Sequence, residues 1–464
     1  MKNIKKLFRI KPLEYNSVVT ELHRCLTATD LTLLGIGAII GAGIFVLTGI
    51  AAATEAGPSI IFSYLLASAA CAFSALAYAE LASSVGGCGS AYGYAFAGIG
   101  ELIAWIIGWD LLLEYGMVTS TVSIGWAGYV QNALQAIGIP LPHSLTTDPF
   151  HGGIINLPAV AVILLLACVL SIGVKESARL NKIIVYVKLA VIALFIVIGA
   201  FYFNPNNWKP FLPFGMQGIV NGAGLIFFAY IGFDAVSTAA EETKQPHRDL
   251  PIGIIASLAI CTVIYIIVSG ILTGIMYYPE LNISSPVATA LMKLGYRFAS
   301  EIVAIGAIAG LTTAILAMYY GFTRVYLAMA RDGLLPKLFV TIDPKSRSPK
   351  QLVWFIGSLM AIVAGLFPIN QIASITNIGT LAAFAAVCGS VIVMRFTKPN
   401  LPRPFRTPWS PLVPIIGIVL CFYLMSSLPK TTWISFGIWT ALGLCVYFGY
   451  GRFNSIAREA TVQV

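Results

Sequence analysis

Long apolar runs dominate this chain and recur along nearly its whole length. A bilayer core of about 30 Å needs about 20 apolar residues of helix. Twelve runs meet or approach this length, at roughly residues 31–54, 59–84, 97–135, 157–173, 180–203, 216–240, 251–276, 299–329, 352–367, 372–395, 411–428 and 432–450. Because 58% of the residues are hydrophobic and only 10% are charged, a water-soluble class is excluded. We predict an all-α integral membrane protein with twelve transmembrane helices.

The basic residues indicate how the chain is oriented. If residues 1–30 are cytoplasmic and the runs alternate in direction, nearly all Lys and Arg residues fall on the cytoplasmic side. The exceptions are Lys209, Lys293, Arg297 and Lys430 on the other side and Lys188 within a run. This is the positive-inside pattern, so the net charge of +9 predicts cytoplasmic termini and no nucleic-acid partner. The N-terminus offers no signal-peptide cleavage site, so we expect the first run to stay in the protein.

No polar linker divides the chain, and we expect one membrane domain over residues 1–464 with a weak internal symmetry. The first run is interrupted at Gly41 to Gly43 and the sixth at Ala229 to Gly232. The second interruption lies five runs after the first, an odd number, so the two halves would have opposite topology. The predicted units are a first repeat at 31–203, a second repeat at 216–395, two further spans at 411–450 and a cytoplasmic tail at 451–464.

The interruptions point to a binding site. Paired interrupted helices at matching places in two halves are typical of the central site of a transporter. Unwinding at Gly41 to Gly43 would expose amides at a helix N-terminus, and such amides bind anions such as a carboxylate. Gly37 and Gly41 also fit a helix-packing motif, whereas a dinucleotide-binding loop is excluded because no strand precedes the glycines. The matching interruption at 228–234 favours the binding site.

Ionisable residues inside the apolar runs suggest proton coupling. Lys188 lies about 12 Å from the cytoplasmic end of its run, and Glu114 lies near mid-depth, with Asp110 one turn below it. Asp234 follows the interruption of the sixth run. Buried charges are costly, so we expect one of these acids to neutralise Lys188. Lys188 could instead form a static ion pair that fixes packing, and Asp110 or Asp234 could cap the amides of a helix break.

Other polar residues give weaker signals. Glu80 and Glu101, near the cytoplasmic ends of their runs, are expected to be interfacial. The eight cysteines show no CxxC and no Cys/His ligand spacing, so we expect no disulfide, metal or cofactor. The runs also contain no nucleophile and base pair, which argues against an enzyme.

Short motifs in the chain resemble the amino acid–polyamine–organocation (APC) superfamily. These are GAGIFVL at 41–47, AGPS at 56–59, YAE at 78–80, GSAY at 89–92, GEL at 100–102 and GWD at 108–110. FAYIGFD at 228–234 and RDGLLP at 331–336 are similar to the cationic amino acid transporter branch in its shorter bacterial form. The resemblance covers nearly the whole chain.

The resemblance implies a LeuT-like fold, with inverted five-helix repeats in spans 1–5 and 6–10 and two further C-terminal helices. It implies that main-chain amides of the first break hold the substrate carboxylate and that carbonyls of both breaks hold the α-amine. The corresponding amides belong to Gly41, Ala42 and Gly43, and the carbonyls to Ile39, Ile40, Phe228, Ala229 and Ile231. Ala42 lacks the hydroxyl that wider superfamily members often place there, which leaves the carboxylate to main-chain amides alone.

The expected function is secondary transport of L-amino acids across the plasma membrane, most simply a bacterial inner membrane. The resemblance places Lys188 where sodium sits in sodium-coupled relatives, so it favours proton-coupled uptake over sodium coupling. From their positions in the apolar runs, we expect Glu114 and Asp234 to take part in the coupling with Lys188. We also expect the segment from Thr312 to Tyr319 to line the side-chain part of the pocket. An exchanger without net proton movement would share every motif. A membrane sensor would need a soluble output domain, which the sequence does not contain.

Overall fold

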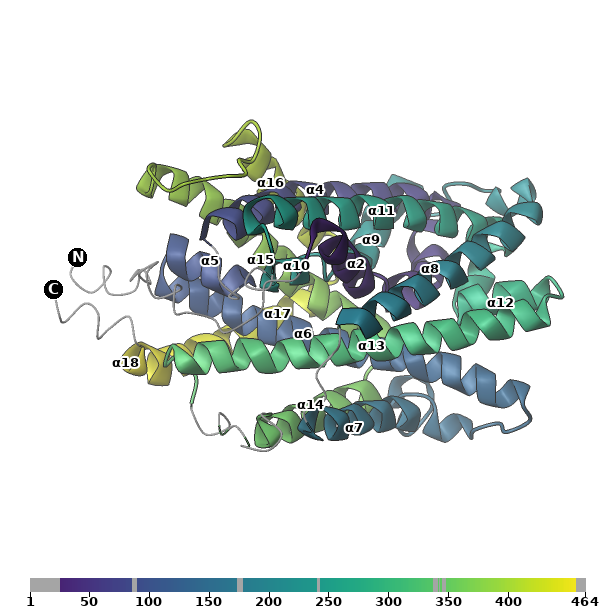
Figure 1. Ribbon diagram of the computed structural model, residues 1–464. Coiled ribbons are helices and arrows are strands. Elements are labelled where there is room, and N and C mark those ends of the chain that lie inside the picture. The colour runs from purple at the N-terminus through teal and green to yellow at the C-terminus, as the bar shows by residue number, and fades with distance from the viewer. Residues whose placement is uncertain are drawn as a thin grey trace.

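A computed structural model describes residues 26–85, 90–172, 178–239, 243–336, 341, 343 and 348–455. Within these residues the regular structure is helical, with one isolated bridge between Leu26 and Thr243. The predicted all-α class is therefore confirmed for the described part of the chain. Figure 1 shows the long helices side by side along one common direction.

Eight of the described helical segments are long and apolar enough to cross a membrane. They are Gly43–Val85, Glu101–Gln135, Lys182–Phe201, Gly215–Ser237, Pro246–Ile275, Arg297–Arg331, Ile369–Thr397 and Lys430–Asn454. Four shorter apolar helices are Ala28–Ile39, Leu157–Ile172, Lys350–Leu366 and Leu412–Ser426. The first long segment joins parts of two predicted spans across Gly57, and the count of twelve spans stays a prediction.

The α-helices have the following bounds. They are α2 (Ala28–Ile39), α3 (Thr48–Ala51), α4 (Ile60–Val85), α5 (Ser90–Gly98), α6 (Glu101–Ala136), α7 (Leu157–Ile172), α8 (Ala178–Phe201), α9 (Gly215–Ile226), α10 (Ala235–Thr238), α11 (Pro246–Ile275), α12 (Pro286–Lys293), α13 (Arg297–Arg331), α14 (Lys350–Leu366), α15 (Ile369–Thr397), α16 (Leu412–Ser426), α17 (Lys430–Val446) and α18 (Arg452–Asn454).

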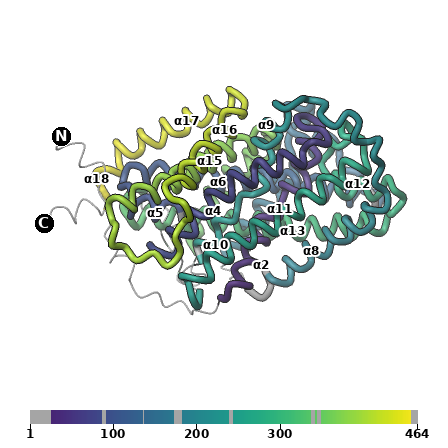
Figure 2. Tube along the Cα trace, turned by 90° about the horizontal axis from the view of Figure 1, so that it is seen from above, coloured from purple at the N-terminus to yellow at the C-terminus, as the bar shows by residue number. Residues whose placement is uncertain are grey.

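The interior of the molecule is built around α2, α6 and the segment Gly215–Ser237. That segment and α6 are mostly buried, whereas Lys430–Asn454 is mostly exposed, and Figure 2 shows α17 at the edge of the molecule. Small residues allow the interior helices to approach closely, as is common between membrane helices. Gly35 of α2 packs against Ser257 of α11, and Gly253 of α11 packs against Leu31 of α2. Helix α2 therefore lies directly against α11, as Figure 1 also shows.

Glu80 and Glu101, which we expected near the membrane interface, both have side chains that are buried in the protein. Arg395 donates to both Glu80 carboxylate oxygens, at 3.0 and 2.6 Å, and the amide of Thr407 donates at 2.7 Å. Arg403 lies 3.4 Å from the same carboxylate. The chain after α15 thus folds back over the end of α4. Glu101 accepts hydrogen bonds from Tyr447 and Ser455, at 2.9 and 2.8 Å.

We predict that Glu80→Ala destabilises the protein by about 3–5 kcal/mol, because it leaves Arg395 and the buried Arg403 without their carboxylate. The matched control is Glu280→Ala, which breaks the exposed pair with Lys293 and should cost no more than about 1 kcal/mol. Thermal unfolding in detergent measures both variants. Equal melting temperatures for the two would contradict a structural role for the Glu80 cluster.

Candidate functional site

The first helix break lies at Ile40 to Ala42. A capping box of Thr27 and Asp30 starts α2, which ends at Ile39. Ile40 then has an extended backbone, with φ −74° and ψ 100°, and a π-helical segment begins at Gly43. The first amides of a helical segment have no partner inside it. The interruption predicted at Gly41 to Gly43 is therefore present, displaced by one residue.

The second break lies between α9 and α10. Helix α9 ends at Ile226, a 3-10 turn covers Phe227–Tyr230, and Ile231 is extended, with φ −61° and ψ 132°. Gly232 has a φ of 116°, which residues with a side chain rarely adopt. This glycine allows the chain to leave the extended residue and turn toward α10. The predicted interruption at Ala229 to Gly232 agrees with the structure.

The two breaks touch each other. Gly43 packs so closely on the backbone of Ala229 that any added side chain would overlap it. A Cβ atom at Gly232 would lie 3.0 Å from the carbonyl of Ala38, at the end of α2. The glycines in these apolar segments therefore bring together the two places where main-chain groups leave the helices.

Lys188 of α8 binds the first break through main-chain carbonyls. Its side chain is buried, and its Nζ donates to the carbonyls of Gly37 at 2.8 Å and Ile40 at 2.9 Å. Its stem passes Gly310 of α13, where an added Cβ would lie 2.8 Å from the Lys188 Cε. The sequence correctly indicated a buried lysine. Carbonyls freed by the break accept two hydrogen bonds from its ammonium group.

The three buried acids form a group of their own. Glu114 interacts electrostatically with Asp234 and Asp110, and Thr380 of α15 lies within hydrogen-bonding reach of it. The carboxylate of Asp234 is close to main-chain amides at the second break, as the capping alternative predicts. One oxygen of each acid, Asp110 Oδ1, Glu114 Oε1 and Asp234 Oδ2, has no hydrogen-bond partner within the described residues. The acids thus keep unused acceptors in the interior.

Tyr265 of α11 is a site residue that the sequence pattern did not reveal. Its hydroxyl lies 2.9 Å from the carbonyl of Ile39 and 2.9 Å from that of Ala229, so it joins the two breaks. Tyrosines in apolar runs usually serve packing or the membrane interface, and nothing in the sequence distinguished this one. Asn377 of α15 was missed in the same way, and its amide donates to two carbonyls of α9, at 2.7 and 2.9 Å.

Four of the five carbonyls expected to hold an amine lie within hydrogen-bonding distance of a protein donor. Tyr265 can donate its one hydroxyl hydrogen to Ile39 or to Ala229, Lys188 donates to Ile40, and the amide of Ile231 donates to the Phe228 carbonyl at 3.2 Å. Each carbonyl oxygen has two lone pairs, so a second donor can be added. A bound amine would therefore share these carbonyls with the protein or displace its donors.

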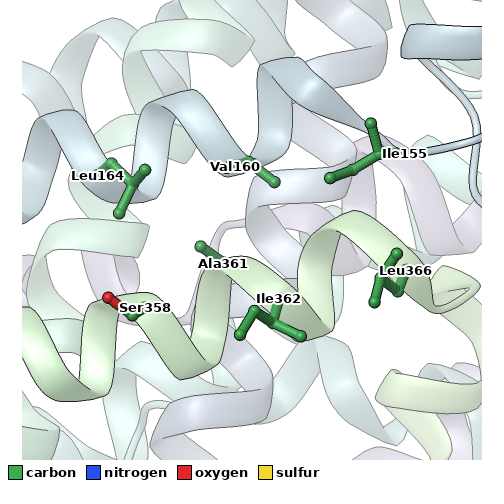
Figure 3. Close-up of a pocket in the computed structure, with 7 residues that line it drawn as sticks. All are labelled: Ile155, Val160, Leu164, Ser358, Ala361, Ile362 and Leu366. Atoms are coloured by element: carbon green, nitrogen blue, oxygen red, sulfur yellow. The ribbon is translucent and has the colours of Figure 1, made fainter.

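The segment from Thr312 to Tyr319 of α13 approaches the first break at Ala314, whose Cβ would lie 3.8 Å from a Cβ at Gly41. A separate apolar cavity of about 270 Å³ lies between α7 and α14, away from the breaks. Figure 3 shows its lining, which consists of Ile155, Val160, Leu164, Ser358, Ala361, Ile362 and Leu366. This cavity has no charged group and does not contain the site residues expected from the sequence.

Comparison with known proteins gives the family. The sequence profile of the amino acid permeases matches residues 26–449. The chain belongs to the amino acid permease family. It is 48% identical to a methylthioribose transporter of Bacillus subtilis, covering 98% of this chain and 99% of that one. It is 47% identical to the branched-chain amino acid permease BcaP of the same organism, over 94% of each chain. Against the cationic amino acid transporter 4 of Mus musculus, identity is 37% over 86% of this chain and 64% of that protein.

These matches confirm the resemblance to APC amino acid transporters that the sequence motifs indicated. The family is one of multi-span membrane transporters. Two of these relatives have nearly equal identity to this chain, 48% and 47%. Their names give chemically different substrates, methylthioribose and branched-chain amino acids. Family membership therefore gives the class of protein, and the substrate has to be argued from the site.

We predict that Gly43→Ala impairs substrate uptake and lowers the melting temperature, because the new Cβ would force the two breaks apart at Ala229. The matched control is Gly437→Ala in α17, where an added Cβ meets nothing within 4 Å. The control should keep wild-type uptake and stability. Unchanged uptake by the Gly43 variant would mean that close contact of the breaks is unnecessary.

Proposed function

We propose that this chain is a secondary active transporter that takes up L-amino acids across the plasma membrane of a bacterium. Membership of the amino acid permease family and the bacterial BcaP relatives support this proposal. The observation that carries it is the contact of two interrupted helices, at Gly43 and Ala229, in the interior of the molecule. Main-chain groups released at such breaks are the usual binding groups of transporters with inverted repeats.

In the proposed complex the substrate lies at the contact of the two breaks. The amides of Gly41, Ala42 and Gly43 bind its carboxylate, since they begin the segment after the first break. The α-amine binds among the carbonyls of Ile39, Ile40, Phe228, Ala229 and Ile231. Because protein donors lie within hydrogen-bonding distance of four of these carbonyls, the bound amine competes with Lys188 and Tyr265 for them.

Proton coupling would follow from the two groups of buried ionisable residues. An arriving ammonium group near the Ile40 carbonyl repels the ammonium of Lys188, which lies 2.9 Å from that carbonyl. The repulsion drives Lys188 to change its charge or its hydrogen-bond partner as the substrate binds. Glu114 and Asp234 can share protons, because adjacent buried carboxylates disfavour simultaneous ionisation.

Alternating access would use a LeuT-like arrangement of twelve helices. The proposed repeats are residues 31–203 and 216–395, followed by two spans at 411–450, with both termini cytoplasmic. Each proposed repeat contains a helix break, in α2 to Gly43 and in α9 to α10, and the two breaks contact each other. Rocking of the repeats about this contact would expose the site to one side at a time. Lys188 of α8 donates a hydrogen bond to the Gly37 carbonyl of α2, and this hydrogen bond would change during the movement.

A second candidate substrate is methylthioribose, favoured by the 48% identity to a transporter with that name. Exchange of amino acids without net proton movement is the alternative mechanism. Purified protein in liposomes separates these possibilities through uptake of labelled leucine, alanine, arginine and methylthioribose. Each is measured with an inward proton gradient, with a sodium gradient, and with unlabelled substrate trapped inside. We expect proton-driven accumulation of an amino acid. Uptake that needs trapped substrate would indicate an exchanger, and uptake of methylthioribose alone would contradict an amino acid transporter.

We predict that Lys188→Ala loses proton-driven accumulation of amino acid. The variant removes the only side-chain ammonium that the structure places on the carbonyls of Gly37 and Ile40 within the described residues. The matched control is Lys182→Ala on the same helix, which removes a partly exposed ion pair with Asp30 and should keep accumulation. Accumulation that persists against the gradient in the Lys188 variant would remove this lysine from the coupling mechanism.

A further inference from the structure

Helix α6 carries four closely spaced hydroxyl residues, and one of them differs from the others. Thr119, Ser120, Thr121 and Ser123 are all fully buried. Three of them donate to the main-chain carbonyl four residues earlier, at 2.7 Å for Thr119, 3.1 Å for Ser120 and 2.7 Å for Ser123. This is the usual way in which a hydroxyl inside a helix is satisfied. The Oγ1 atom of Thr121 has no hydrogen-bond partner within the described residues.

A buried hydroxyl without a partner is unfavourable, and such groups in native proteins usually bind a ligand or water. Thr121 could lower this cost by donating to the carbonyl four residues earlier, as its neighbours do. Its hydroxyl remains instead available to a group that is not part of the protein. The orphaned atom thus marks a position where a polar group of a ligand can be bound.

The helix face that carries Thr121 points toward the two breaks. Residues separated by four or seven positions share one face of a helix. Gly125, four positions after Thr121, packs against the first break, where an added Cβ would lie 3.5 Å from the Ala42 Cβ. Glu114, seven positions before Thr121, interacts with Asp234 just after the second break. Thr121 therefore lies between Glu114 and Gly125, on the face of α6 that approaches the segments of both breaks.

We propose that the hydroxyl of Thr121 donates a hydrogen bond to the carboxylate of the bound amino acid. This inference rests on the proposed function. Ala42, next to Gly125 of α6, is one of the three residues whose amides would bind the carboxylate. Because Ala42 has no hydroxyl, Thr121 on the facing helix supplies the side-chain donor from the other side of the substrate. The amine, in contrast, meets carbonyl acceptors of the breaks and does not need a donor.

The test compares three substitutions at Thr121 with one at Thr119. Thr121→Val removes the hydroxyl and keeps the branched shape of the side chain, whereas Thr121→Ala removes both. Thr121→Ser keeps the hydroxyl. Thr119→Val is the matched control, since its hydroxyl is already bonded to a main-chain carbonyl. Each variant is assayed in liposomes for KM and maximal rate with the amino acid that the wild type takes up best among leucine, alanine and arginine. The amine produced by removing the carboxyl group of that amino acid serves as a competitor.

We expect Thr121→Val and Thr121→Ala to raise the KM about tenfold or more, as for loss of a hydrogen bond to a charged group. Thr121→Ser and Thr119→Val should stay within about twofold of the wild type. The inhibition constant of the carboxyl-free amine should not change in any variant. This pattern separates carboxylate binding from packing, because a packing defect would weaken the amino acid and the amine alike.

Equal weakening of both compounds, or failure of Thr121→Ser to keep the wild-type KM, would overturn the inference. An unchanged KM in the valine and alanine variants, with intact uptake by the wild type, would overturn it while leaving the proposed function standing. A wild-type protein that takes up none of the amino acids would overturn both. If the valine variant does not fold, as judged by size-exclusion chromatography, the alanine variant gives the same comparison.

Discussion

The close contact of two interrupted helices is the constraint on which the rest of this structure depends. In a membrane, every main-chain polar group needs a partner, and irregular backbone is tolerated only where protein or a polar cavity surrounds it. Here the two breaks face each other through Gly43 and Ala229, inside the most buried part of the molecule. Lys188 and Tyr265 then satisfy carbonyls that the breaks release. The breaks, the buried lysine and the bridging tyrosine are therefore parts of one arrangement.

We propose that the substrate binds at main-chain groups of the two breaks, and such a site would suit a family whose members are named for unlike substrates. Main-chain amides and carbonyls recognise charged or polar groups, whatever side chain the ligand carries. Side chains from neighbouring helices must then add selectivity, and α6 and α13 both reach the breaks, at Gly125 and Ala314. The acids Glu114 and Asp234 lie beside the second break, where they can act on its conformation without occupying the contact itself.

The sequence predicted the features that depend on local pattern and missed those that depend on partners distant in the chain. Glycines within apolar runs located both breaks, and the depth of Lys188 within its run predicted a buried ammonium. Its acceptors could not be predicted, because main-chain carbonyls carry no sequence signal. Tyr265 and Thr121 look like ordinary residues of apolar helices, and only their contacts, or the lack of one, distinguish them. The burial of Glu80 was not predicted, because it depends on Arg395 and the chain that follows, which fold back over it.

The most direct test of the account is a cryo-electron microscopy structure of the protein bound to the amino acid that it takes up. The account predicts density for the ligand at the contact of the two breaks, with its carboxylate at the amides of Gly41 to Gly43. The amine should lie at the carbonyls that Lys188 and Tyr265 contact in the present structure. Ligand density in the cavity between α7 and α14, or anywhere else away from the breaks, would contradict it.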